Sequence, residues 1–297
     1  MNPESGGPAA RSEAGPLSSG AVQPSRATPI LIRPSRGWIG MGVRELWQFR
    51  DLGYFLVWRD LKVRYKQTLF GAAWAVLQPV FLMLVFSAFL GRIEGIAPAS
   101  VPYPLFALAG LVPWTLFSQS LNGASNSLVN SQNLISKVYF PRLLLPLAGV
   151  GSYIADFLIA LAVLLLVTPL FGVIPTATIL WLPVFGLLAV LAALAVGTWL
   201  SAIYVRYRDL KYAIPFLIQA WLFASPIAYS ADLIPDELRL IYALNPIAGV
   251  VEGFRWALLG GPRPDTTILL STAATVVILV GGIAYFRRME RTFADVI

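Results

Sequence analysis

The chain has 297 residues, of which 57% are hydrophobic and 12% are charged, and its formal net charge is +7. Soluble domains carry about 25% charged residues, so this composition excludes an ordinary water-soluble protein. The chain has no cysteine and no histidine, which excludes disulfides, thiol nucleophiles, imidazole bases and the usual zinc sites. We therefore predict no catalytic residue, no metal and no cofactor. Because the basic residues cluster beside apolar runs, we expect no nucleic-acid partner.

The N-terminal 68 residues contain no span-length apolar run. Residues 1–40 are rich in Pro, Gly, Ser and Ala, which predicts a disordered tail without a cleaved signal peptide. Residues 41–68 are interrupted by charge too often to span a membrane. They predict an amphipathic helix lying in the membrane interface, although packing of this helix on protein is an open alternative. Its polar strip consists of Gln48, Asp51, Arg59, Lys62 and Lys66.

Long apolar runs fill residues 69–297, which we predict to form one transmembrane domain of an all-α membrane protein. A bilayer core about 30 Å thick needs about 20 residues per helical span. The runs are continuous and do not alternate with period two, which favours helices over a barrel. We place six spans at 69–90, 104–121, 145–169, 178–203, 212–230 and 266–286.

The basic residues orient these spans. Fourteen Lys or Arg residues lie on one side of the predicted stack and four lie on the other, namely Arg92, Arg239, Arg255 and Arg263. Because basic residues concentrate in cytoplasmic loops, we expect both termini to be cytoplasmic. An even number of spans agrees with this orientation.

The outer loop between the fifth and sixth spans is long and has a second apolar stretch, IYALNPIAGVVEGFRWALLGG. Polar residues break this stretch too often for it to span. We predict two short re-entrant helices, which are tolerated only where protein or a water-filled cavity encloses them. Asn245, Glu252 and Arg255 are the candidate residues of an outer gate, and Glu252 and Arg255 are three apart, a spacing that allows an ion pair.

Four segments in order carry a resemblance: WRDLKVRYKQTLFGAAWAVLQP, NSQNLISKVYFPRLLLPLA, YVRYRDL and SPIAYSADLIPDELRLIYALNPIAGVVEGFRWALLG. Together they resemble the permease subunit of ABC exporters for lipid-linked polysaccharides and polyol phosphates, such as O antigens, capsules and teichoic acids. The resemblance covers residues 41–297.

The resemblance implies a multi-pass protein of the bacterial inner (cytoplasmic) membrane that works as a homodimer. It implies two copies of a separate cytoplasmic ATP-binding subunit, a lipid-linked glycan as cargo, and contact with membrane lipids. The chain has no G-x-x-x-x-G-K-[ST] phosphate loop. We therefore expect a transport subunit and not an enzyme, with ATP hydrolysed by the partner.

The inner loop between the second and third spans is the predicted contact with the ATPase. In the resembled family this position carries a short coupling helix, and an ordinary polar loop is the open alternative. The coupling candidates are Asn133, Leu134, Ile135, Lys137, Phe140 and Arg142. The charged loop 204–211 is either a second ATPase contact or a membrane anchor.

Aromatic residues near the spans are candidates for a glycan path, because rings stack on the flat C–H faces of sugars. Interface belts and packing are the alternative roles. The path candidates are Trp74, Phe81, Trp114, Tyr153, Trp221, Phe223 and Tyr229. Asp156 is an intramembrane acid and therefore a functional candidate, with a helix cap or a pair with an inner-loop cation as the alternative.

Two other functions stay open. An ion-coupled secondary transporter usually places several ionisable groups at the membrane midplane, where this chain offers Asp156. A membrane glycosyltransferase would gather acids or metal ligands in a loop, but the acids of the outer loop show no recognisable spacing. The exporter permease is the function that we predict.

Overall fold

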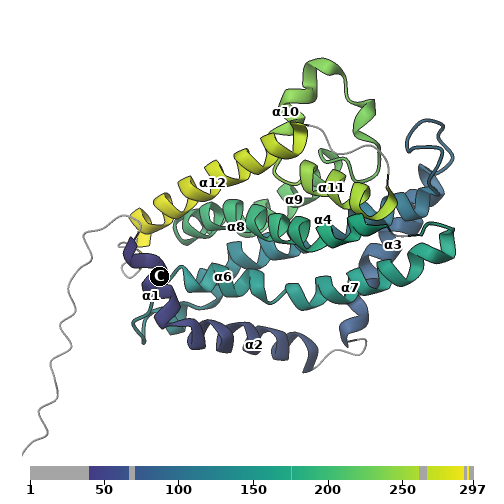
Figure 1. The fold of residues 1–297 in the computed structure, drawn as a ribbon. Coiled ribbons are helices and arrows are strands. Elements are labelled where there is room, and N and C mark those ends of the chain that lie inside the picture. The colour runs from purple at the N-terminus through teal and green to yellow at the C-terminus, as the bar shows by residue number, and fades with distance from the viewer. Residues whose placement is uncertain (1–39, 67–70, 175, 261–265, 291–292, 294–297) are drawn as a thin grey trace, which may run out of the picture. The chain divides into compact units, whose positions relative to one another are not determined.

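A computed structural model describes residues 40–66, 71–174, 176–260, 266–290 and 293. Within these ranges every regular element is a helix, which confirms the all-α prediction. The tail predicted at 1–40 lies outside the described residues, apart from Gly40. Figure 1 shows α4 (Tyr103–Asn130) and α8 (Leu182–Arg206) side by side among the other helices.

Five helical segments are long and apolar enough to cross a membrane. They are Gly71–Phe89 (η1, Gly71–Ala73, and α3, Trp74–Phe89), α4, Leu144–Phe171 (α6, Leu144–Gly151; α7, Ile154–Val167; η2, Thr168–Phe171), Ala177–Arg206 (η3, Ala177–Trp181, and α8) and α12 (Thr266–Glu290). The span predicted at 212–230 corresponds to α9 (Leu210–Phe223), which has only 14 residues. By length and composition the described residues thus hold five spans and one shorter apolar helix.

The second span is longer than its pattern predicts, since α4 continues to Asn130 and not only to residue 121. Polar residues in its last turns bond within the helix. The Ser125 hydroxyl donates to the Leu121 carbonyl (2.7 Å), and the Asn126 amide donates to the Asn122 carbonyl (2.7 Å). This local bonding lets the helix carry polar side chains, so part of the predicted inner loop is helical.

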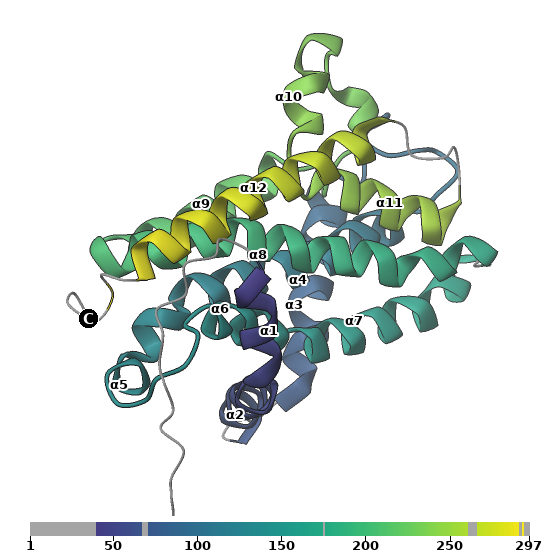
Figure 2. The same ribbon diagram turned by 60° about the vertical axis from the view of Figure 1, so that its left-hand side comes forward.

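The segment predicted as one interfacial helix forms two, α1 (Gly40–Gln48) and α2 (Arg50–Lys66). In Figure 2 α2 is seen nearly end-on while α7 and α8 run across the view, so α2 lies at a steep angle to them. Leu56 is buried, and α2 packs on α6. Tyr54, Phe55 and Trp58 remain more than half exposed. One side of α2 therefore packs on protein, whereas the helix also carries exposed aromatic rings.

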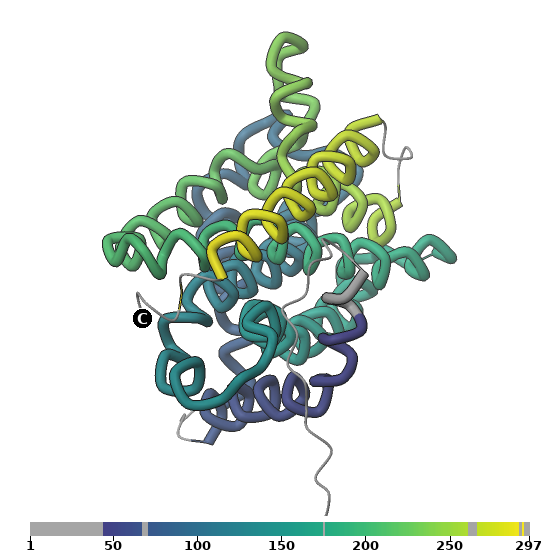
Figure 3. The backbone as a smooth tube through the Cα atoms, turned by 90° about the vertical axis from the view of Figure 1, so that its left-hand side faces the viewer, coloured from purple at the N-terminus to yellow at the C-terminus, as the bar shows by residue number. Residues whose placement is uncertain are grey.

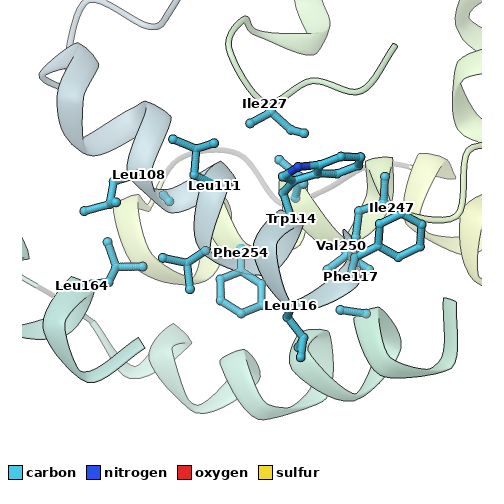
Figure 4. Packing of buried hydrophobic residues seen from close by; sticks show 14 of the residues in the cluster. Leu108, Leu111, Trp114, Leu116, Phe117, Leu164, Ile227, Ile247, Val250 and Phe254 are labelled. Carbon is cyan, nitrogen blue, oxygen red and sulfur yellow. The ribbon is translucent and has the colours of Figure 1, made fainter. Parts of the chain in front are cut away.

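The core surrounds α4, which packs against α3, α6, α7, α8 and α11 (Ala248–Leu259). In the 18-residue apolar window of α4, 83% of the residues are buried, against 11% in the corresponding window of Gly71–Phe89. Figure 4 shows Leu111 and Phe117 of α4 in one buried cluster with Leu164, Ile247 and Phe254. The α3 helix instead lies at the edge.

The outer loop forms two 3₁₀ turns and two short helices, in line with the two helices predicted there. The turns are η4 (Ala231–Leu233) and η5 (Asp236–Leu238), and the helices are α10 (Arg239–Ala243) and α11. Most of α11 is buried against α4, α8 and α12. Protein therefore encloses α11, and its re-entry into the membrane stays a prediction.

Candidate functional site

The predicted coupling segment, residues 132–142, begins with the short helix α5 (Gln132–Ile135). Ile135 and Phe140 are buried in a cluster with side chains from α2, α4, α6 and α12, which we call the inner cluster. Asn133, Lys137, Val138 and Tyr139 are exposed, Tyr139 by 72%, and Leu134 is half-buried. Ile135 and Phe140 thus attach the segment to the helices, and the exposed side chains, Ser136 included, form its outward surface.

Arg142 attaches the coupling segment to the end of α12. Its backbone N–H donates to the Glu290 carboxylate (3.0 Å), and its guanidinium donates to the Glu290 carbonyl. The guanidinium also lies 5.9 Å from the centre of the Phe293 ring, which is buried. Figure 3 faces the end of the helices where these segments gather. Arg142 therefore has an internal role in this structure.

The third predicted span breaks at Ser152 and Tyr153, between α6 and α7. Arg64 of α2 fills this break. Its guanidinium donates to the Asp156 carboxylate (2.6 Å), to the Ser152 carbonyl (3.2 Å) and to the Ser152 hydroxyl (3.0 Å), and it lies 3.8 Å above the Tyr153 ring. Asp156 is thus paired with a cation, although that cation comes from α2 and not from an inner loop.

A cavity of about 180 Å³ adjoins this network, between α2, α3, α4 and α7. Trp74 and Tyr153, two of the path candidates, line it together with Gln78, Gln119 and Asp156. A second cavity of about 420 Å³ shares Arg64 and Tyr153 and extends between α2, α4 and α6. Asp156 was a candidate by itself, but its meeting with Gln78 and Gln119 at one cavity was not predicted, because the three residues come from separate spans.

The other path candidates are dispersed. Trp114 is 4% exposed and belongs to the core, where its ring lies 5.5 Å from that of Phe117. Phe81 and Phe223 are 66% and 61% exposed on α3 and α9. Trp221 in α9 and Tyr229 in the irregular stretch after it are both partly buried. The structure therefore brings together Trp74 and Tyr153 at one cavity but not the seven as a set.

Asn245 holds the chain that follows α9. Its side-chain oxygen accepts from the Trp221 indole N–H (2.9 Å) and from the Ile247 backbone N–H (3.2 Å), and its amide donates to the Ser225 hydroxyl (2.9 Å). These bonds connect α9, the irregular segment 224–230 and the start of α11. A single side chain thus fixes three parts of the outer region.

Arg255 of α11 holds the same irregular segment from the other side. Its guanidinium donates to the carbonyls of Ile227 (2.7 Å), Tyr229 (3.3 Å) and Phe106 (3.4 Å), and it lies 3.5 Å above the Phe106 ring. Burial lowers the pKa of Arg255 to about 9, so the group is still cationic at neutral pH. The hydrogen bonds of Arg255 described above all end on backbone carbonyls. Its expected ion pair with Glu252 stays a prediction.

Comparison with known proteins places this architecture. Residues 52–259 match the family model described as ABC-2 type transporter. The chain is 32% identical over 257 residues to the O-antigen export system permease protein RfbA of Myxococcus xanthus, covering 85% of this chain and 98% of that protein.

Two further relatives are more distant. The chain is 26% identical over 249 residues to an RfbA permease of Klebsiella pneumoniae, covering 83% of this chain and 95% of that protein. It is 23% identical over 237 residues to the polysialic acid transport protein KpsM of Escherichia coli, covering 78% and 91%. The family match spans well over half of the chain, and the chain belongs to the ABC-2 type transporter family of membrane proteins.

Proposed function

We propose that the chain is the transmembrane permease subunit of an ATP-driven exporter that moves a lipid-linked polysaccharide from the cytoplasm across the bacterial inner membrane. The polysaccharide is of the O-antigen, capsule or teichoic-acid type. Similarity along nearly the whole length of an O-antigen export permease carries this proposal. Two copies of the chain would pair with two copies of a separate ATP-binding subunit, and the coupling segment would contact that subunit.

The proposed topology has six spans and two cytoplasmic termini. A helix of 14 residues rises about 21 Å, so α9 alone is shorter than a bilayer core. The irregular segment 224–230 would complete this crossing. Its residues 225–228 are buried, and irregular backbone is tolerated at membrane depth where protein encloses it. We therefore infer that α9 and this segment together form the crossing predicted at 212–230, the fifth of six.

A second copy of the chain would cover the edge of the structure at α3 and α9. Both helices expose large aromatic side chains there, including Phe81 and Phe223. A path between two copies would be lined by such rings, on which sugar faces can slide. This arrangement would use the exposed path candidates, whereas Trp114 would remain in the core.

Glycan-stimulated ATP hydrolysis tests the proposed function. The chain, purified with a candidate ATP-binding subunit and reconstituted in lipid, should hydrolyse ATP faster when a lipid-linked O-antigen or capsule glycan is added. The same glycan should move across the membrane with ATP and without an ion gradient. Transport driven by an ion gradient in the absence of ATP would favour the secondary transporter.

Cysteine labelling tests the proposed orientation, because the chain has no cysteine of its own. Asp236 is 89% exposed in the outer segment, and Lys137 is exposed in the coupling segment. A membrane-impermeant maleimide should label Asp236→Cys in intact spheroplasts, but should label Lys137→Cys only after permeabilisation. The reverse pattern would overturn the orientation.

The exposed ring of Tyr139 tests the coupling segment. Removing an aromatic side chain from the centre of an interface costs about 2 kcal/mol or more, which is more than a tenfold loss of affinity. Tyr139→Ala should therefore weaken co-purification of the ATP-binding subunit and reduce export. Tyr54→Ala is the matched control, since Tyr54 has the same 72% exposure on α2. Wild-type assembly and export in Tyr139→Ala would exclude this surface as the contact.

The buried guanidinium of Arg255 tests the outer gate. Arg255→Met keeps the apolar stem but removes the donors to three carbonyls, at a cost on the order of 1–3 kcal/mol per unsatisfied group. We expect a looser outer segment, measured as leak of a small fluorescent solute from proteoliposomes and as ATP hydrolysis without glycan. Arg239→Met is the control, because Arg239 is 63% exposed and pairs with Asp236 at the surface. Equal leak and coupling in both variants would contradict the gate.

A further inference from the structure

The cavity beside the break between α6 and α7 has the composition of a sugar site. Its volume of about 180 Å³ far exceeds the roughly 10–15 Å³ that a cavity needs to hold one water molecule. Its walls combine the rings of Trp74 and Tyr153 with the amides of Gln78 and Gln119 and the carboxylate of Asp156. Three spans and α2 contribute to these walls, so the lining depends on the tertiary fold.

The aromatic walls suit the flat side of a sugar ring. The face of an aromatic ring carries partial negative charge, which attracts the weakly positive C–H groups of a pyranose face. Trp74 lines the cavity and is 55% exposed overall, so its ring is the aromatic wall that we assign as the platform. Arg64 already lies over the Tyr153 ring, which leaves Tyr153 as part of the wall.

The polar walls suit hydroxyl groups. The Gln119 amide donates to the Gln78 side-chain oxygen (3.0 Å), and this bond leaves the Gln78 amide hydrogens and the Gln119 side-chain oxygen without a partner among the described residues. One oxygen of Asp156 is enclosed and has no donor in the described part of the chain. A hydroxyl both donates and accepts, so a polyol satisfies this mixture of donors and acceptors better than an ion does.

The charges at the cavity argue for a neutral ligand. Arg64 and Asp156 are its charged lining residues, and their side chains meet at 2.6 Å. The Ser152 carbonyl and hydroxyl occupy further donors of Arg64. A phosphate would therefore meet a carboxylate and a neutralised guanidinium, whereas an uncharged sugar would meet no like charge.

We propose that this cavity binds one neutral sugar unit of the exported glycan, with Trp74 as the stacking platform and with Gln78, Gln119 and Asp156 contacting its hydroxyls. Arg64 is a positioning residue, because it holds Asp156 and Tyr153 in place. The identification of the sugar as part of an exported glycan rests on the proposed function. Binding of a free glycoside to the cavity does not.

Saturation-transfer NMR on the complex of the chain with its ATP-binding subunit, in lipid nanodiscs, tests this site. The probes are methyl glycosides of glucose, mannose, galactose and rhamnose, each at millimolar concentration. At least one should receive saturation through the C–H groups of one ring face. Trp74→Ala and Gln119→Leu should each weaken binding of that glycoside about five- to tenfold, the loss expected for a stacking contact or a pair of hydrogen bonds, and Trp74→Phe should retain part of it.

The chain supplies matched controls. Trp58 on α2 has the same 55% exposure as Trp74 but does not line the cavity, and Gln48 is an exposed glutamine at the end of α1. Trp58→Ala and Gln48→Leu should bind the glycoside like the wild type. Co-purification of the ATP-binding subunit and an unchanged gel-filtration profile show that each variant is folded.

Three results would overturn the site: no glycoside signal in the wild type, equal signals in Trp74→Ala and Trp58→Ala, or displacement of the glycoside by inorganic phosphate at similar concentration. The assay of glycan-stimulated ATP hydrolysis tests the proposed function independently of this site. Stimulation without cavity-dependent glycoside binding rejects the site and keeps the function. Glycoside binding without stimulation by any lipid-linked glycan rejects the function and keeps the site.

Discussion

Backbone carbonyls inside an apolar layer have no water to bond, and each one left without a donor costs several kcal/mol. Among the described residues, the apolar helices are interrupted between α6 and α7 and after α9. At each place an arginine from another helix supplies the donors: Arg64 bonds the Ser152 carbonyl, and Arg255 bonds the carbonyls of Ile227 and Tyr229. Both guanidiniums also lie over an aromatic ring, 3.8 Å from Tyr153 and 3.5 Å from Phe106, an arrangement that strengthens when water is excluded.

Each of these arginines belongs to a helix that is not among the five long apolar segments. Arg64 lies near the end of α2, and Arg255 lies in α11. The irregular backbone of the third span and the segment after α9 therefore depend on the positions of α2 and α11. A shift of either helix would remove the arginine donors from these carbonyls. Under the proposed function, this dependence connects the two ends of the path to α2 and α11.

Local pattern predicted the elements whose structure is decided locally. Apolar length predicted the helices α3, α4, α8 and α12, and the polar interruptions of residues 231–265 predicted α10 and α11. The end of α4 was misplaced because Ser125 and Asn126 bond to carbonyls of their own helix. Within the span predicted at 212–230, the end of the helix at Phe223 was not predicted. The chain beyond it is held by Asn245 and Arg255, whose contacts are 20 or more residues away in sequence.

The candidate sites were harder to predict, because a residue's type does not reveal its neighbours. Ile135, Phe140, Val138 and Tyr139 are all apolar or aromatic, yet the first two are buried and the last two are exposed. Trp74 and Trp114 looked equivalent, but one lines a cavity and the other lies in the core. The partner of Asp156 is 92 residues away, and no periodicity reports a contact at that separation.

The arrangement of α6 connects the two inner features of the chain. Leu144 and Leu145, in its first turn, pack in the inner cluster with Ile135 and Phe140 of the coupling segment and with Leu56 of α2. Eight residues later the same helix ends beside Ser152, which Arg64 of α2 holds. Because α2 and α6 are thus joined at both ends of α6, a displacement of the coupling segment cannot move one without the other. Under the proposed function, the motion produced by the ATP-binding subunit would reach the break between α6 and α7, and the cavity beside it, through a connection of only two turns of helix.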